Sequence, residues 1–196
     1  TYLCLGPGFS SASNTPFRRH KTWVHEGGIS TPFIVHWPAG IKARGELRHT
    51  PGHFIDLMPT ALELAGLKKP EDWNGQPLPP AHGRSIVPAF SSDMTGLHQG
   101  LWWFHNGNRA IQVGDWKLVS AGNAPWELYN LSGDRAEQHN LAEERPEKVK
   151  SLAKAWQKRT DDISEVVRKS KRNLFDNVRV GPPSGDGIAP PPTPSP

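Results

Sequence analysis

The stretch LWWFHNGNRAIQVGDWKLVSAGNAPWELYNL, from Leu101 to Leu131, decides the kind of fold that the sequence predicts. Four short runs rich in apolar residues follow one another in it, at 101–105, 109–113, 116–120 and 126–131. Turn-forming pairs separate the runs: Asn106-Gly107, Gly114-Asp115 and Gly122-Asn123. Short strand-like runs divided by such turns predict an antiparallel meander.

A long helix is predicted directly after the meander, over residues 147–170, with Pro146 placed in its first turn. Its apolar residues fall on one face: Val149, Leu152, Ala153 and Trp156. Residues 173–196 end in Pro-Pro-Pro-Thr-Pro-Ser-Pro, a composition that predicts disorder. We therefore expect a small subdomain of sheet and helix over residues 96–172, followed by a disordered tail.

The part of the chain before the meander has the pattern of an α/β layer. The run TPFIVHW at residues 31–37 does not alternate with polar residues, so it predicts a strand buried on both faces, as in a parallel sheet. Asp56 is expected to cap a helix that ends at Gly66. The apolar face of that helix would carry Met58, Ala61, Leu62 and Ala65. Residues 1–20 are expected to form an ordered loop, and residues 67–100 a long connection.

Length and composition restrict the classes of protein. The 196 residues suffice for one domain or slightly more, and a net charge of +4 suits an anionic ligand without establishing nucleic-acid binding. The single cysteine, Cys4, permits no disulfide within the chain. No apolar run approaches the ~18–20 residues of a membrane span, and no signal peptide is visible. Because the chain starts with Thr1 inside an irregular stretch, we expect the C-terminal piece of a longer protein.

Two groups of residues are candidate sites from their chemistry alone. Lys21 stands five residues before Glu26, at the end of a basic cluster, and a lysine ammonium suits a tetrahedral oxyanion. A solvated basic loop explains the same residues more simply. His49, His53 and Asp56 have a spacing that suits a metal on a continuous helix, but a Pro-Gly pair interrupts it, so no metal ligand is assigned.

Five ordered blocks of sequence resemble the C-terminal third of the arylsulfatase-type sulfatases, which belong to the alkaline phosphatase-like superfamily. The blocks are PFRRHKTWVHEGGISTPFIVHWPAGI, HFIDLMPTALELAG, GRSIVPAF, GNRAIQVGDWKLV and WELYNL. The resemblance covers roughly residues 5–160. It implies an α/β fold: part of the sheet of the catalytic domain over residues 1–95, then the small antiparallel sheet with its C-terminal helix.

The resemblance also implies a sulfuric ester hydrolase in which Lys21 contacts the substrate sulfate. Arg18, His25, His105 and Arg109 would lie at the rim of that site. The family uses a formylglycine, made from the first residue of Cys/Ser-x-Pro/Ala-x-Arg, and a calcium ion held by carboxylate and amide oxygens.

Neither the formylglycine motif nor the acidic metal ligands of the family are found in this chain. Cys4 is followed by glycines where proline or alanine and arginine are required, and Ser10 has Asn14 at the arginine position. We therefore expect both groups upstream of Thr1, no cofactor on this chain's own residues, and little activity of the piece alone. The piece alone should also expose apolar surface along residues 31–37. By family resemblance the complete enzyme would be periplasmic or extracellular.

Three alternatives remain open at this point. A phosphoryl hydrolase or transferase of the same superfamily would also bind a tetrahedral oxyanion. A non-catalytic remnant or binding module is the second, in which sugars would stack on the tryptophans of the meander: Trp102, Trp103, Trp116 and Trp126. Nucleic-acid binding through the basic residues 168–172 is the weakest of the three. The main expectation is a small-molecule or carbohydrate sulfate ester as partner, without nucleic acid or membrane.

Overall fold

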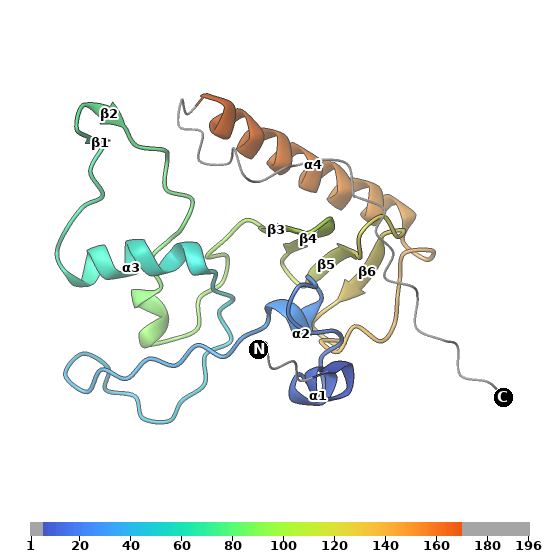
Figure 1. Ribbon diagram of the computed structural model, residues 1–196. Coiled ribbons are helices and arrows are strands. Elements are labelled where there is room, and N and C mark those ends of the chain that lie inside the picture. The colour runs from blue at the N-terminus through green and yellow to red at the C-terminus, as the bar shows by residue number, and fades with distance from the viewer. Residues whose placement is uncertain (1–5, 170–196) are drawn as a thin grey trace.

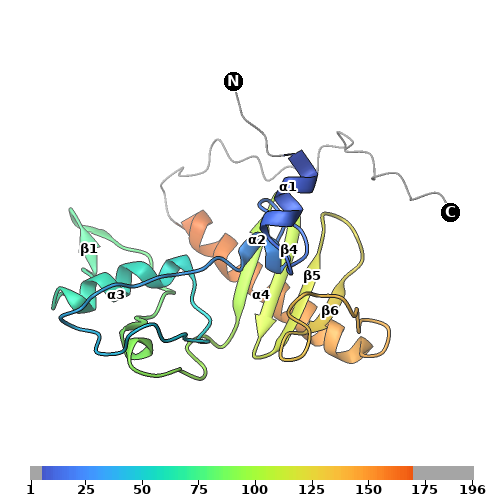
Figure 2. The ribbon, with the colours of Figure 1, turned by 90° about the horizontal axis from the view of Figure 1, so that it is seen from below.

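The computed structural model describes residues 6–169 of the chain. A four-stranded sheet lies between a long helix, α4, on one face and the short helix α2 on the other (Figures 1 and 2). The helices are α1 (Gly6–Ser13), α2 (Glu26–Ile29), α3 (Leu57–Leu64), α4 (Pro146–Lys169) and the 3-10 turns η1 (Phe54–Asp56) and η2 (Val87–Phe90). The strands are β1 (Asp72–Trp73), β2 (Gln76–Pro77), β3 (Leu101–His105), β4 (Asn108–Val113), β5 (Trp116–Ser120) and β6 (Glu127–Asn130).

The predicted meander is confirmed. Strands β3 to β6 pair antiparallel in sequence order, with Trp103 opposite Ala110 and Lys117 opposite Tyr129. Asn106 and Gly107 both have positive φ, 48° and 79°, as the tight turn between β3 and β4 requires. The strand bounds differ from the prediction only at the start of β4 and at both ends of β6.

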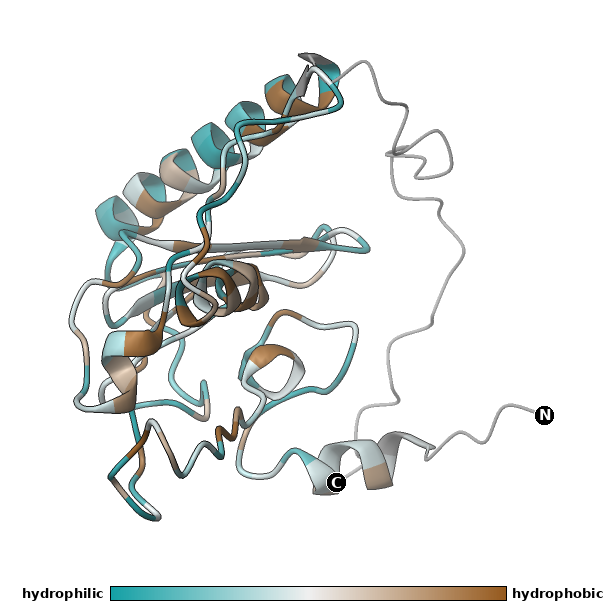
Figure 3. Ribbon diagram, turned by 90° about the vertical axis from the view of Figure 1, so that its left-hand side faces the viewer, coloured by the Kyte–Doolittle hydropathy of each residue, from teal (hydrophilic) through white to brown (hydrophobic). Residues whose placement is uncertain are grey.

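The predicted helix after the meander is confirmed as α4, which begins one residue earlier than predicted, at Pro146, and is described as far as Lys169. Hydrophilic residues alternate with hydrophobic ones along it (Figure 3). Leu152 and Trp156 are buried against one face of the sheet, where they pack with Ile111, Leu118 and Leu128. The other face of the sheet packs a second cluster: Val24, Ala110, Val119, Tyr129 and Leu131. The sheet is therefore covered on both faces.

The prediction of a buried strand at residues 31–37 is wrong for this structure. No strand forms there, and every residue from 31 to 40 is exposed. Ile34 is 87% exposed and Phe33 61% exposed. A parallel strand requires a neighbouring strand, and within residues 6–169 all paired strands are antiparallel and none lies beside this run. The expected exposure of apolar surface along this segment is confirmed.

The predicted helix after Asp56 is confirmed as α3, and Gly66 has the expected positive φ of 66°. Its cap differs from the prediction, because the Asp56 side chain makes no capping bond to α3 and instead forms a capping box with His53 around η1. The expected apolar face is also not buried: Met58 is 56% exposed. Among residues 6–169 no other element covers that face.

Two segments expected to be irregular contain short elements. Helix α1 occupies part of the predicted loop at residues 1–20, and the β1–β2 hairpin and η2 interrupt the predicted connection at 67–100. None of the helices within residues 6–169 has both the length and the hydropathy of a membrane span. The interpretations that involved Cys4, the basic residues beyond 169 and the tail at 173–196 lie outside the described residues.

Candidate functional site

Lys21 lies at the exposed tip of the loop that enters α2. Arg19 and Thr22, on either side of it, both have positive φ, 68° and 92°. For a β-branched residue such as Thr22 this conformation is a rare outlier. Strained backbone of this kind persists only where surrounding contacts hold it, and it concentrates at functional sites. The loop is therefore held in an unfavourable shape around an exposed lysine.

Gly27 and Gly28, the two residues after Glu26, must be glycines because the backbone of the Lys21 loop passes close to them. The amide of Gly27 donates to the carbonyl of Arg18 at 2.9 Å. A Cβ on Gly27 would lie 2.3 Å from the carbonyl oxygen of Arg19, and one on Gly28 would lie 2.0 Å from that of Trp23. Both contacts are with backbone atoms, which no rotamer change can relieve. Gly27 and Gly28 thus allow the Lys21 loop to fold back over α2.

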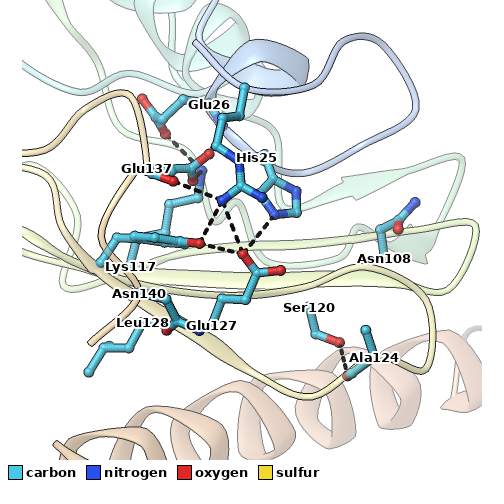
Figure 4. A network of polar contacts seen from close by, with 12 residues as sticks. His25, Glu26, Asn108, Lys117, Ser120, Ala124, Glu127, Leu128, Glu137 and Asn140 are labelled. Carbon is cyan, nitrogen blue, oxygen red and sulfur yellow. Dashed lines mark hydrogen bonds and ion pairs between the residues drawn. The ribbon is translucent and has the colours of Figure 1, made fainter. Parts of the chain in front are cut away.

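Behind the loop, α2 is joined to the sheet by a buried ionic network (Figure 4). The ammonium of Lys117, on β5, lies 2.8 Å from a carboxylate oxygen of Glu26 and 2.8 Å from one of Glu137. Lys117 and Glu137 are fully buried, and Glu26 is 4% exposed. The second oxygen of Glu137 accepts the amide of Glu26 at 2.9 Å. This arrangement fixes the start of α2 to the meander.

The charge of Glu26 is stabilised from both sides of its carboxylate. Its second oxygen accepts a bond from Arg135 at 3.0 Å, and Arg135 also donates to Ser30 at 2.9 Å. Burial by itself would raise the pKa of Glu26, but Lys117 and then Arg135 outweigh burial and lower it. Glu26 is therefore a buried carboxylate that remains ionised.

A second set of contacts surrounds Glu127 at the start of β6. Arg18 Nη1 lies 3.2 Å from Glu127 Oε2, 2.7 Å from the hydroxyl of Tyr129 and 2.8 Å from the carbonyl of Glu137. The Tyr129 hydroxyl donates to Glu127 Oε2. His25 Nε2 lies 3.6 Å from the same oxygen, which is beyond hydrogen-bond length.

These contacts shift two pKa values in opposite directions. The approach of His25, opposed by burial and reinforced by Tyr129 and Arg18, lowers the pKa of Glu127 to about 2. Burial and the neighbouring Glu127 carboxylate raise the pKa of Tyr129 above its ordinary value. At neutral pH the carboxylate is thus ionised and the phenol is a donor.

The structure places the five residues that the resemblance assigned to the site in three different surroundings. Lys21 is exposed, and His105 lies at the exposed end of β3, opposite Asn108. Residues opposite each other in an antiparallel pair share a face, and the Asn108 side chain donates to the carbonyl of Thr22 at 3.1 Å. His105 is therefore on the same face of the sheet as the Lys21 loop.

The other three residues do not form a rim in this structure. Arg18 is committed to its acceptors on β6 and beyond, and His25 is fully buried, so its ring has no access to a ligand. Arg109 lies on the opposite face, with its guanidinium 4.6 Å from the ring centre of Trp126 and 5.7 Å from that of Trp156. Its Nε is buried without a hydrogen-bond partner among the described residues. Arg109 thus belongs to the packing under α4.

The family of N-sulphoglucosamine sulphohydrolase C-terminal domains matches residues 18–165 of this chain. The chain belongs to this family. The match includes the Lys21 loop, the ionic network and the whole meander. The family assignment agrees with the resemblance to arylsulfatase-type sulfatases.

Curated relatives with sulfatase names are similar to most of this chain. An uncharacterized sulfatase of Schizosaccharomyces pombe is 29% identical over 80% of the chain and 29% of its own length. Arylsulfatase K of Danio rerio is 26% identical, over 80% of the chain and 31% of its own length. N-acetylgalactosamine-6-O-sulfatase of Bacteroides thetaiotaomicron is 28% identical, over 70% of the chain and 28% of its own length. The chain thus spans about a third of the length of these proteins.

Solved structures show the same fold. The crystal structure of Ps i-CgsB is 26% identical, with a TM-score of 0.57 over 74% of this chain and 32% of that one. The same protein has been solved in complex with k-i-k-neocarrahexaose. The chain therefore has the fold of part of a sulfatase of the alkaline phosphatase-like superfamily.

The described residues of this sulfatase-family chain do not fit the calcium ion of the family. The Asp56 carboxylate accepts hydrogen bonds from the backbone amides of His53 and Arg84 at 2.8 Å each. One of its oxygens lies 2.9 Å from the Nε2 of His98. Burial lowers the pKa of His53 despite the charge of Asp56. Within residues 6–169, however, no three His, Cys, Asp or Glu side chains are placed to hold a metal. The Asp56 cluster is a structural clamp between η1 and the segment around residues 84–98.

Five residues of the site were missed by sequence reasoning: Lys117, Glu127, Tyr129, Arg135 and Glu137. One signal was available for Lys117. It stands two residues before Val119 in β5, so the two side chains point to the same, buried face of that strand. A lysine on a buried face requires a carboxylate partner. The sequence carries no comparable signal for Glu137, which lies in an irregular turn.

Proposed function

We propose that the full-length protein hydrolyses sulfate esters and that Lys21 supplies positive charge to the bound sulfate. Membership of the sulfatase family supports the reaction class, and the geometry of the loop supports the residue. The observation that carries the proposal is the exposed ammonium of Lys21 on a strained loop fixed by the buried network of Glu26, Lys117 and Glu137. A loop held this firmly suits a charge that must be placed before the substrate arrives.

The role of Lys21 follows from its chemistry. Its ammonium has three donors and no acceptor, so it neutralises negative charge on the sulfate oxygens as the ester bond breaks. His105, on the same face of the sheet, is the second candidate for contact with substrate. Arg18 and His25 act from below the loop by holding it. In the family a formylglycine supplies the nucleophile and calcium the Lewis acid, and neither group is held by the described residues of this chain.

The substrate class is proposed from the relatives. One is named N-acetylgalactosamine-6-O-sulfatase, and Ps i-CgsB has been solved in complex with k-i-k-neocarrahexaose. We propose a carbohydrate or other small-molecule sulfate ester, handled in a periplasmic or extracellular compartment. We further propose that residues 1–95 complete an α/β catalytic domain and that residues 96–172 form its C-terminal subdomain.

The test is Lys21→Ala in the full-length protein. Removing one donor of this kind lowers kcat by about 10²–10³-fold, so kcat/KM for a sulfate monoester should fall by that factor. Lys154→Ala is the matched control, since Lys154 is an exposed lysine on α4. An unchanged rate in Lys21→Ala would remove Lys21 from the mechanism. Faster hydrolysis of the corresponding phosphate monoester by the unaltered protein would favour the phosphoryl hydrolase alternative.

The alternative of a sugar-binding tryptophan surface is not supported by the packing. Trp102, Trp116 and Trp126 lie against the cluster under α4, and the Trp102 indole nitrogen donates to Thr160 at 3.0 Å. Trp103 packs on the opposite face beside Val24 and Ala110. Their rings are therefore engaged with the core of the subdomain.

A further inference from the structure

A single carboxylate oxygen meets both ends of the Lys21 loop. Glu127 Oε2 lies 3.2 Å from Arg18 Nη1, three residues before Lys21, and 3.6 Å from His25 Nε2, four residues after it. The two partners come from either side of the strained residues Arg19 and Thr22. Glu127 thus joins the two ends of the loop, while the loop tip remains outside.

The contact with Arg18 is reinforced by neighbours on the sheet. The Tyr129 hydroxyl donates to Glu127 and lies 2.7 Å from Arg18 Nη1. The carbonyl of Glu137 lies 2.8 Å from the same nitrogen. The guanidinium is therefore held by acceptors from β6 and from the turn that follows it, so its position is well determined.

Among the described residues, Glu127 is the acidic side chain within 4 Å of the His25 ring. The His25 side chain is fully buried, and neither ring nitrogen has a hydrogen-bond partner within residues 6–169. Burying a polar ring without a partner is unfavourable, so the electrostatic contact with Glu127 offsets part of that loss. Losing the charge of Glu127 should therefore loosen this end of the loop as well.

We propose that Glu127 is a positioning residue, which clamps both ends of the loop and thereby places the Lys21 ammonium against the sulfate. Glu127 itself does not touch substrate, because its carboxylate faces Arg18, His25 and Tyr129 beneath the loop. The inference rests on the proposed function for its effect on rate. The clamp itself is a statement about loop structure and can be tested without turnover.

The structural test uses trypsin, because the loop contains its own cleavage sites at Arg19 and Lys21. Glu127→Gln preserves the shape of the side chain and removes its charge. In the full-length protein we expect cleavage after these residues, mapped by mass spectrometry, to become at least about tenfold faster than in the unaltered protein. Cleavage after Lys42, in a separate exposed segment, should not change. Glu144→Gln, at an exposed acid before α4, is the matched control.

The kinetic test is a double-mutant cycle with Lys21→Ala. Glu127→Gln should lower kcat for a sulfate monoester by about 10–100-fold, because misplacement by about 1 Å has effects of that size. In the Lys21→Ala background the same change should have less than about a twofold effect, since the group that it positions is gone. Tyr129→Phe, which removes only a hydroxyl, should lower kcat in the same way but by a smaller factor, and it provides the measurement if Glu127→Gln does not fold.

The outcomes separate the two proposals. Unchanged trypsin cleavage in Glu127→Gln overturns the clamp, and an equal fall in kcat in both backgrounds overturns the action through Lys21. Faster cleavage together with an unchanged rate in Lys21→Ala supports the clamp and overturns the proposed role of Lys21 in catalysis. Faster cleavage together with a fall in kcat only when Lys21 is present supports both.

Discussion

Replacing Lys117 with methionine should destabilise the meander severely. The change keeps most of the side-chain volume and removes the charge that lies between Glu26 and Glu137. Both carboxylate oxygens lie 2.8 Å from the same ammonium, in a site where Lys117 and Glu137 have no exposed surface. The variant therefore retains two buried carboxylates with no cation between them.

The magnitude follows from these distances. At an effective dielectric constant of about 20, each pair at 2.8 Å contributes roughly 6 kcal/mol of attraction. Desolvation of the buried ions offsets much of this, by several kcal/mol for each ion. Removing one partner of a buried pair therefore costs about 3–5 kcal/mol. By contrast, Lys150→Met removes an exposed i,i+3 pair with Glu147 and should cost at most about 0.5 kcal/mol.

Hydrogen exchange of the β5 amides in the full-length protein is the appropriate assay, because it reports the opening of this strand rather than of the whole chain. Lys117→Met should speed exchange by about 10²–10³-fold, and Lys150→Met by less than about threefold. Exchange in Lys117→Met that stays within threefold of the unaltered protein would refute the reasoning. It would mean that the buried ionic network contributes little to the stability of β5.

The same variant should depend on pH in a defined direction. Despite burial, Lys117 holds the pKa of Glu26 below its ordinary value. The unfolded state then binds more protons, so this stabilisation is complete above about pH 4.5 and is lost as the pH falls through the folded pKa. In Lys117→Met the Glu26 carboxylate loses the cation that lowers its pKa and takes up a proton more readily. The difference in exchange between the two proteins should therefore shrink from pH 8 to pH 5.

Two further predictions concern packing. Trp156→Ala should destabilise the subdomain by about 3–5 kcal/mol, because Trp156 is only 6% exposed and its indole nitrogen donates to the Trp103 carbonyl at 3.1 Å. Urea unfolding followed by tryptophan fluorescence measures this loss of stability. Gly28→Ala should lower sulfatase kcat by at least about tenfold, because the new Cβ would lie 2.0 Å from the Trp23 carbonyl. Gly133→Ala, where the Cβ meets no atom within 4 Å, should leave the rate unchanged.

The parts of the fold that the sequence predicted well are those that depend on neighbours within a few residues. The meander follows from turn pairs such as Asn106-Gly107 and from runs whose length suits a strand. Helix α4 follows from Pro146 and the apolar spacing around Trp156, which the structure confirms. These patterns contain their own partners, so no knowledge of the rest of the fold is required.

The site could be predicted only in part, because its partners are distant in the sequence. Lys21 was selected by resemblance, and its exposure on a strained loop is consistent with that choice. The contact of Glu26 with Lys117 spans 91 residues, and that of Arg18 with Glu127 spans 109. No periodicity encodes such pairs. The resemblance placed His25 at the rim of the site, whereas the structure buries it beneath the loop.

The dependence on distant partners also explains why the Lys21 loop is held in one shape while the run at residues 31–37 forms no strand. The loop is anchored by residues of this chain: Lys117 on β5, Glu127 on β6 and Glu137 in the following turn. The apolar run at residues 31–37 has the composition of a strand, but a strand is stabilised by its neighbours rather than by its own residues. Since no strand within residues 6–169 pairs with it, its apolar side chains stay exposed, whereas the charged residues Glu26, Lys117 and Glu137 are buried. Burial in this chain thus follows the availability of partners more closely than it follows hydrophobicity.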